Sequence, residues 1–302
     1  MNKRVVDSDD IPALATFYLR LYNRIPKCRL PGTNLNLGFM LFWMIVFFML
    51  RWMYLYLFFS CGWPRNNKST YYAVASFIGG YFHATQIVPL TYVLITSQKP
   101  HYNPSATSKV SPTWWNQATD AALQLCTAYM VYDFFFLVWV HRIPGKGIVL
   151  DNEAIMYMIH HFMTSFYMTT CRIFEAGQSS ALTCIFLGEF TNTSFNTYFI
   201  FEMARKVDLS FSPFVSQFVI PIELFTAALY LLFRIILSPL ILSYVSYSLL
   251  KDLEIRIAVP LFMRAIWICL MAAVIYGSIG QNVIFMEMLK EKFGWNGVDN
   301  EL

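Results

Sequence analysis

The sequence predicts an all-α protein, a multi-pass transmembrane helical bundle of six or seven spans. Two observations lead to this prediction. First, 57% of the 302 residues are hydrophobic and only 13% are charged, whereas soluble domains average about 45–50% apolar and about 25% charged residues. Second, mostly apolar runs of the length that a helix needs to cross a bilayer, about 20 residues, recur along the chain with short loops between them.

The candidate spans are taken in order along the chain. They are 37–59, 71–96, 120–140, 153–174, 179–204, 220–249 and 257–288. The fourth and fifth are polar for spans and are separated only by "EAGQS", so we expect an antiparallel hairpin shielded from lipid by the other helices. In the sixth, Pro221 suits a helix start, and Pro239 is expected to kink the helix interior, which neighbouring membrane helices tolerate.

The chain is expected to form one bundle with two short ends. Residues 1–36 are predicted as a cytosolic or interfacial segment, 37–292 as the bundle, and 293–302 as a tail. Basic residues before the first span place the N-terminus in the cytosol under the positive-inside rule. The net charge of +4 is spread along the loops, which argues against a nucleic-acid partner. The bilayer and its lipids are the expected partners.

Titratable side chains recur near the middle of the second to sixth spans. They are His83, Asp133, His160, His161, Glu189 and Arg234. Ionisable groups are expensive inside a bilayer, and by default they mark a functional site. Because groups at similar depth can meet, we expect this set to line one internal cavity. The alternative is that each residue simply joins two helices by hydrogen bonds worth about 1 kcal/mol.

Helical spacing adds polar neighbours to this set. Glu189, Asn192 and Asn196 fall at i, i+3 and i+7, on one face of a helix. His160 and Thr164 are one turn apart, whereas His161 lies about 100° around the helix from His160. The two histidines therefore reach a cavity from its two flanks.

Histidine and carboxylate groups in a dry cavity suggest proton transfer. A neutral imidazole is a general base near neutral pH, and a carboxylate can orient it. The candidate catalytic residues are His160, His161, Asp133 and Glu189, and the candidate substrate-binding residues are His83, Thr164, Asn192, Asn196 and Arg234. No metal site is expected, because adjacent histidines diverge and the sequence has no HxxxH box. No cofactor is expected either, although acyl-CoA would be the co-substrate of an acyltransferase.

Five motifs, in order, resemble the TLC-domain family, the membrane fold of ceramide synthases, translocation-associated membrane proteins and several lipid-regulating proteins. They are "SFIGGYFHA" (76–84), "YMVYDFFF" (129–136), "HHFMT" (160–164), "LGEFTNTSFN" (187–196) and "LFRIILSPL" (232–240). The resemblance covers about 68–292. Ceramide synthases carry His-Asp-x-x-Asp in the fifth-span region, where this chain has Gly188-Glu189-Phe190-Thr191-Asn192. The chain is therefore more similar to the non-synthase members.

Three functions follow as expectations from this resemblance. The first is an endoplasmic reticulum or Golgi membrane protein that binds a lipid in its cavity and influences membrane lipid composition. The second is an acyl-CoA-dependent N-acyltransferase acting on a lipid amine, as in ceramide synthases. The third is a cargo or trafficking receptor of the secretory pathway, in which the bundle serves as a scaffold.

Overall fold

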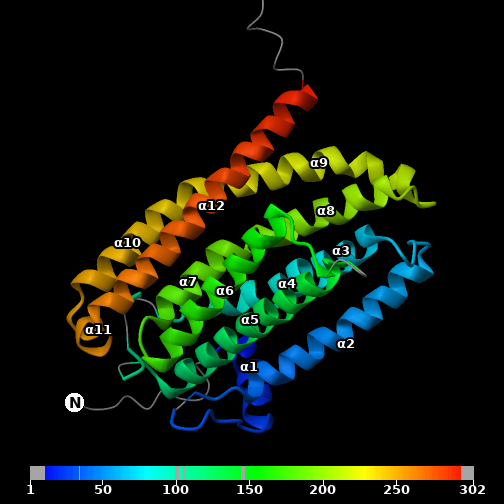
Figure 1. Ribbon diagram of the computed structural model, residues 1–302. Helices are drawn as coiled ribbons and strands as arrows, with labels where there is room; N and C mark the ends of the chain where they lie inside the picture. Colours follow the sequence, from blue (N-terminus) through cyan, green and yellow to red (C-terminus); the bar gives the residue numbers. More distant parts are fainter. Residues whose placement is uncertain are drawn as a thin grey trace, which may run out of the picture.

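The structure, a computed structural model, describes residues 11–293 except 34, 99–101, 105–106, 110 and 144–146. Most of the described chain is helical, which confirms the all-α prediction (Figure 1). The described chain also contains a short two-stranded antiparallel ribbon, β1 (Arg142–Ile143) and β2 (Gly147–Ile148). Residues 1–10 of the predicted N-terminal segment lie outside the described residues. So does the predicted tail, 293–302, apart from residue 293.

The first half of the chain begins with a short amphipathic helix, α1 (Ala13–Arg24). The helices that follow it are α2 (Gly38–Ser60), α3 (Lys68–Ser76), the π-helical η2 (Phe77–Phe82), α4 (His83–Thr96) and α5 (Thr113–Val140). Those of the second half are α6 (Asn152–Ile173), α7 (Gln178–Glu189), α8 (Asn192–Lys206), α9 (Ser212–Tyr230), the π-helical η3 (Leu231–Leu237), α10 (Ser238–Lys251), α11 (Leu253–Ala258) and α12 (Leu261–Phe293).

Consecutive long helical runs alternate in direction. Helices α2 and α5 run in the same direction, because they meet at Met40–Gln124 and Phe47–Tyr132. The α3–α4 run and α6 are antiparallel to α5, as shown by the contacts Leu94–Trp115 and Tyr72–His141 for the first and Arg172–Asp120 and His161–Asp133 for the second. Helix α7 is antiparallel to α4, with contacts at Gln98–Ser179 and His83–Glu189. As a result, α2, α5 and α7 begin at one end of the bundle, which we call the Asp120 end. The opposite end is called the His141 end.

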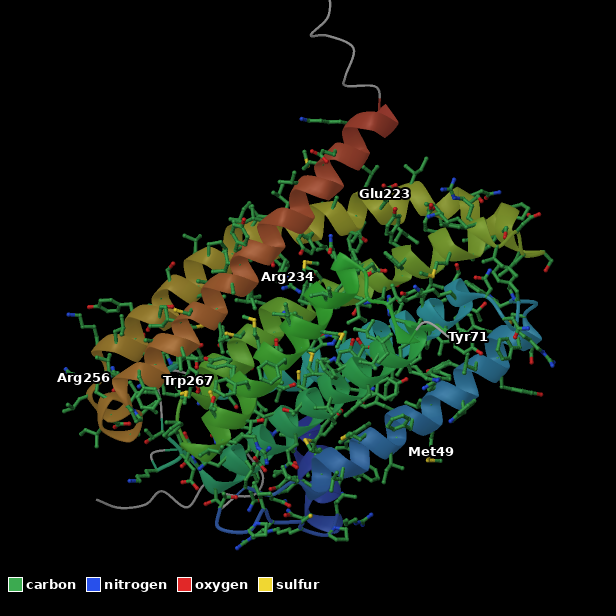
Figure 2. All side chains as sticks on the ribbon, viewed as in Figure 1. Met49, Tyr71, Glu223, Arg234, Arg256 and Trp267 are labelled. Carbon is green, nitrogen blue, oxygen red and sulfur yellow. The ribbon has the colours of Figure 1, made fainter. Side chains whose placement is uncertain are left out.

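Helix α5 is the centre of the bundle. Its apolar stretch is 78% buried, whereas those of α2, α9–α10 and α12 are only 17–22% buried. Figure 1 shows why, because α2 lies on one flank and α9, α10 and α12 on the other. Small buried residues such as Ala118, Ala121 and Ala122 allow neighbouring backbones to approach α5 closely. The outer helices present apolar side chains to the surroundings, as does Met49 of α2, which is 67% exposed (Figure 2).

Four helical segments of the described chain are long and apolar enough to cross a membrane. They are Gly38–Ser60, Thr113–Val140, Ser212–Lys251 and Leu261–Gly280. The other predicted spans correspond to α3–α4, α6 and α7–α8, the helices that carry most of the polar residues singled out above. The chain is therefore a multi-pass membrane protein by length and composition, with its most polar helices packed around α5.

Two predicted helix boundaries are wrong. Pro221 does not begin a helix, because α9 already begins at Ser212, has a proline in its first turn and continues through Pro221. The predicted fifth span, 179–204, is not one helix, because α7 ends at Glu189 and α8 begins at Asn192. The turn between them, formed by Phe190 and Thr191, contains neither proline nor glycine, so the sequence gives no local signal for the break.

Pro239 lies where the prediction placed an irregularity. The seven residues of η3 directly precede α10, whose first turn contains Pro239. A proline removes one backbone donor and crowds the preceding turn, and a π-helical segment shifts the hydrogen bonds around that point. Ser238 Oγ donates to Phe233 O at 2.7 Å and satisfies one of the carbonyls involved.

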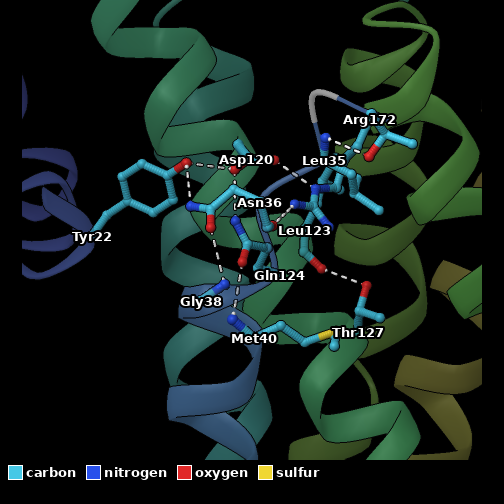
Figure 3. Close-up of polar contacts among 11 residues, drawn as sticks. Tyr22, Leu35, Asn36, Gly38, Met40, Asp120, Leu123, Gln124, Thr127 and Arg172 are labelled. Atoms are coloured by element: carbon cyan, nitrogen blue, oxygen red, sulfur yellow. Dashed lines mark hydrogen bonds and ion pairs between the residues drawn. The ribbon is translucent and has the colours of Figure 1, made fainter. Parts of the chain in front are cut away.

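A polar network closes the Asp120 end of the bundle (Figure 3). Asp120 accepts from Arg172 Nε at 2.5 Å, from the Tyr22 hydroxyl at 2.7 Å and from Gln124 Nε2 at 2.6 Å. Arg172 also donates to Asn36 O. Burial, together with the neighbouring Asp120 charge, raises the pKa of Tyr22 to about 12. The phenol therefore stays protonated and keeps donating to Asp120, and the network ties α1 and the 25–37 segment to α5 and α6.

Candidate functional site

A buried histidine and a buried carboxylate meet between α4 and α7. His83 Nδ1 lies 3.3 Å from Glu189 Oε2, and Asn192 Nδ2 donates to the same oxygen at 2.9 Å. His83 is fully buried and Glu189 is 5% exposed. Glu189 therefore accepts from two residues that come from different helices, and its contact with Asn192 crosses the break between α7 and α8.

The π-helical segment η2 sets the position of His83. It contains Gly79 and Gly80, and a side-chain carbon on either glycine would collide with a neighbour. At Gly80 the neighbour is the Asn196 amide, and at Gly79 it is the Tyr129 ring. The glycines thus let Asn196 and Tyr129 pack directly against the η2 backbone. Single-turn π segments within α-helices are frequent at functional sites.

Tyr129 connects the two histidine–carboxylate pairs. Its ring stacks on His83, with centroids 4.3 Å apart and planes 29° apart, and it meets His161 edge-on at 6.0 Å. His161 Nδ1 lies 3.4 Å from Asp133 Oδ2. That contact is not aligned as a hydrogen bond, so Nδ1 of His161 has no hydrogen-bond partner within the described chain.

His160 and Thr164 face a cavity of about 70 Å³ that lies among α5, α6, α7, α12 and the η3–α10 run. Glu189 and Arg234 also line it. Most of the remaining wall is apolar or sulfur-bearing, with Cys126, Met130, Met163, Met168, Cys184, Leu242, Leu270, Met271, Val274 and Ile275 among its residues. The cavity therefore has a cluster of polar groups within an otherwise apolar wall.

Arg234 reaches the cavity from the π-helical segment η3 (Figure 2). Its guanidinium donates to Gly188 O and, through Nε at 3.3 Å, to Thr191 Oγ1. Both acceptors flank the end of α7, where the helix has stopped and backbone carbonyls lack their usual partners. Arg234 therefore stabilises the α7–α8 break.

The structure places some of the predicted site residues on the cavity wall and the others behind it. His160, Thr164, Glu189 and Arg234 line the central cavity. His83 and Asn192 contact Glu189 from behind the cavity wall, and His161 pairs with Asp133 on the other flank of His160, with the two histidine rings 5.7 Å apart. Asn196 donates to Asn192 O at 2.7 Å and accepts from Ser76 Oγ at 2.5 Å.

Some residues of this region were not singled out from the sequence. Tyr129 and Thr191 stand inside the quoted motifs, but nothing in an aromatic-rich run distinguishes a ring that stacks on histidine. The sequence does mark Arg51 as unusual, because it is a charged residue inside the first apolar run. It is buried, and its guanidinium carbon lies 4.7 Å from the Phe136 ring centroid and 3.6 Å from that of Trp139. Glu223, buried in α9, gave the same signal.

The chain matches the family model of the TLC domain over residues 67–290, which is most of its length. It belongs to the TLC-domain family. The matched region begins just before α3 and ends within α12, so α1 and α2 precede the TLC domain. All nine predicted site residues lie within the TLC domain. A comparison with curated proteins found no match.

Proposed function

We propose that this TLC-domain protein binds a membrane lipid in the central cavity and influences membrane lipid composition. The observation that supports the proposal most directly is the make-up of the cavity wall. His160, Glu189 and Arg234 are polar and charged, whereas the surrounding methionine, leucine and isoleucine side chains are apolar. An amphiphile needs both kinds of surface. Residence in the endoplasmic reticulum or Golgi is a further part of this proposal and rests on the family resemblance.

The size of the cavity limits what it holds. A volume of about 70 Å³ is roughly that of two water molecules, and an apolar cavity of about 150 Å³ accepts a benzene ring. The cavity therefore accommodates a polar head or a short alkyl segment, and a long chain requires the walls to move. Met130, Met163, Met168 and Met271 suit such a wall, because methionine side chains are flexible and repack readily.

A cavity-filling substitution tests lipid binding. Ser278 lines the cavity, and its hydroxyl donates only to Val274 O, one turn earlier. We expect Ser278→Leu to fill the cavity and to reduce the lipid that co-purifies with the protein, as measured by mass spectrometry, by several-fold. Ser248→Leu is the matched control, because Ser248 makes the same bond one turn back, to Tyr244 O, but does not line the cavity. Equal lipid retention by both variants and the wild type would contradict the proposal.

A second candidate function is acyl transfer from acyl-CoA to a lipid amine. It is favoured by the histidine–carboxylate pairs, His161 with Asp133 and His83 with Glu189, that flank the cavity-lining His160. In this reaction the amine nitrogen attacks the thioester carbonyl, His160 takes the amine proton, and CoA leaves as a thiol after that proton is returned. Asp133 and Glu189 would hold the neighbouring imidazoles in place.

Purified protein given acyl-CoA and a sphingoid base separates the two functions. Acyl transfer predicts product formation by the wild type and a loss of about 10²–10⁴ in rate for His160→Ala, the usual contribution of a general base. Lipid binding without chemistry predicts no product and weaker lipid retention by the same variant. If the wild type forms no product and His160→Ala retains lipid as the wild type does, the acyl-transfer proposal is wrong and His160 is only a packing residue.

A further inference from the structure

A second, larger cavity lies at the Asp120 end of the bundle. Its volume is about 340 Å³, and most of its wall is polar. Its lining residues come from α1, the 25–37 segment, the loop before α5 and the adjoining ends of α5, α6 and α7; those that the argument uses are Lys27, Arg29, Asn116, Arg172, Glu175 and Gln178. No predicted site residue lines this cavity.

Arg172 and Asp120, which both line the second cavity, neutralise each other's charge. Arg172 is held by Asp120 at 2.5 Å and by Asn36 O, so its guanidinium is committed to the network of Figure 3. The Arg172 side chain is 2% exposed and that of Asp120 is 22% exposed. Arg172 is therefore already paired, and the anion of a ligand would bind to other cations of the cavity wall.

The charges that remain in the wall are of both signs. Lys27 and Arg29 are exposed residues between α1 and α2, and neither forms an ion pair with a carboxylate in the described part of the chain. Glu175 belongs to the turn between α6 and α7, where its φ of 50° is left-handed, and its carboxylate accepts from the Ser108 hydroxyl at 3.2 Å. The cavity therefore has two unpaired cations and a carboxylate on separate segments of its wall.

The side-chain oxygens of two lining residues have no hydrogen-bond partner among the described residues. Asn116 Oδ1 and Gln178 Oε1 are buried and accept no hydrogen bond from the described residues. The orientation of the Asn116 amide is defined by its nitrogen, which donates to Ser108 O at 2.8 Å. Leaving a buried acceptor without a hydrogen bond is unfavourable. Because the Asn116 nitrogen keeps its bond to Ser108 O, a ligand with N–H donors would satisfy these oxygens by displacing the side chains that cover them.

The position of the cavity suggests a membrane-surface ligand. Asp120 precedes Cys126, a residue of the central cavity, by six residues along α5, which is about 9 Å at 1.5 Å per residue. The neighbouring helix α1 packs Ala15, Tyr18 and Tyr22 into the core of the bundle. Helix α2, which is long and apolar enough to cross a membrane, begins at Gly38, two residues after Asn36, which lines the second cavity. The second cavity thus opens near the depth of lipid head groups.

We propose that the second cavity binds an aminoalkyl phosphate, the chemistry of a phosphoethanolamine head group. The phosphate lies against Lys27 and Arg29, and the ammonium group donates to Glu175 and to the amide oxygens of Asn116 and Gln178. A choline head group has no N–H donor for these acceptors, and a glycerol phosphate brings no positive charge to Glu175. The site is distinct from the central cavity and does not depend on lipid binding there.

Binding of short-chain lipids to the detergent-solubilised full chain tests this proposal. The probes are phosphatidylethanolamine, phosphatidylcholine and phosphatidylglycerol that carry the same fluorescent acyl chain. We expect the tightest binding for phosphatidylethanolamine. Lys27→Ala with Arg29→Ala should weaken it by about 10–100-fold, which corresponds to about 1.4–2.8 kcal/mol at 1.4 kcal/mol per tenfold change. Glu175→Gln should remove the preference over phosphatidylcholine while phosphate binding persists.

The matched control removes two other basic residues from the same region. Arg20 and Arg24 are exposed on α1 and do not line the cavity, so Arg20→Ala with Arg24→Ala makes the same change in net charge. Equal weakening by both pairs would mean that only surface charge attracts lipid, and it would overturn the proposal. Equal affinity of the wild type for all three lipids would overturn it as well.

A competition experiment identifies the source of the ligand. Soluble O-phosphoethanolamine is added to the complex with fluorescent phosphatidylethanolamine. Displacement supports a site that recognises the head group alone, and retention, together with the selectivity above, supports a site for the membrane lipid. If neither the lipid nor the soluble compound binds more tightly than its choline counterpart, the proposal is wrong.

Discussion

His83 Nδ1 and Glu189 Oε2 lie 3.3 Å apart in the interior of the bundle, and this contact joins the start of α4 to the end of α7. The same carboxylate oxygen accepts from Asn192, the first residue of α8. One carboxylate therefore holds together three helices around the π-helical segment η2 and the α7–α8 break. The consequences for stability are testable.

Removing that carboxylate should be strongly destabilising. Glu189→Ala leaves the His83 and Asn192 donors without their acceptor, and breaking a buried pair typically costs about 3–5 kcal/mol. The free energy of unfolding, measured by denaturation in mixed micelles, checks this. The control is Glu202→Ala, whose carboxylate pairs with exposed Arg205 at 2.7 Å, because exposed pairs contribute only about 0–1 kcal/mol. Similar losses for the two variants would contradict the structural role of Glu189.

Gly80→Ala should be destabilising although alanine favours helices. A side-chain carbon at Gly80 would collide with the Asn196 amide, and overpacking of this kind costs about 1–3 kcal/mol. At Gly277, in α12, the same substitution meets no atom within 4 Å, so Gly277→Ala should be neutral or stabilising by up to about 1 kcal/mol. Thermal unfolding in detergent distinguishes the two variants.

A second-site change tests whether the collision with Asn196 is the cause. Asn196→Ala should recover part of the stability that Gly80→Ala loses, because it removes the side chain that the new methyl group would meet. If the double variant is less stable than Gly80→Ala by the full cost of Asn196→Ala alone, the two positions are independent and the proposed steric cause is wrong.

Asp120→Ala should cost more stability than removing both charges of its pair. The single change leaves the Arg172 guanidinium buried without its carboxylate, which is worth about 3–5 kcal/mol in comparable cases. Asp120→Ala with Arg172→Met removes the stranded charge and should be less destabilised than Asp120→Ala alone. A double-mutant cycle on the free energy of unfolding measures the difference. Additive losses would show that the ion pair contributes nothing.

The first turn of α6 depends on Asp151 at its N-cap. Asp151 Oδ1 accepts from Ala154 N at 2.8 Å, and Asp151→Ala should cost about 0.5–2 kcal/mol of stability. Asp151→Asn keeps the cap and serves as the control. The backbone hydrogen bond from Ala154, aided by His141, lowers the pKa of Asp151 below its usual 3.8. The stabilisation is therefore fully present above that value and is lost as the pH falls through the lower, folded-state pKa.

Measuring stability against pH for wild type and Asp151→Ala checks the sign of this effect. The difference between the two proteins should be constant near neutral pH and should shrink on strong acidification. A difference that instead grows as the pH falls would mean that the protonated form of Asp151 is the better cap.

Much of the architecture could be predicted from the sequence, because it depends on residues that are close along the chain. The apolar run that forms α2 lies at 37–59 in the prediction and at Gly38–Ser60 in the structure. The tight turn between α6 and α7 follows from "EAGQS", where Gly177 has a φ of 71°. His160 and Thr164, one turn apart on α6, both line the central cavity. Periodicity and turn chemistry are local, so one sequence suffices to detect them.

The tertiary structure alone decided the features that join distant segments. The break after Glu189 contains no helix breaker, and it is accompanied by Arg234, 45 positions along the chain from Glu189, which donates to Gly188 O and Thr191 Oγ1. His161 contacts Asp133 rather than the cavity, while Tyr129 stacks on His83. The free energy of such contacts depends on which helices pack around α5 and at what offset. That offset comes from small buried residues and close glycine contacts across the whole bundle, which no local pattern records.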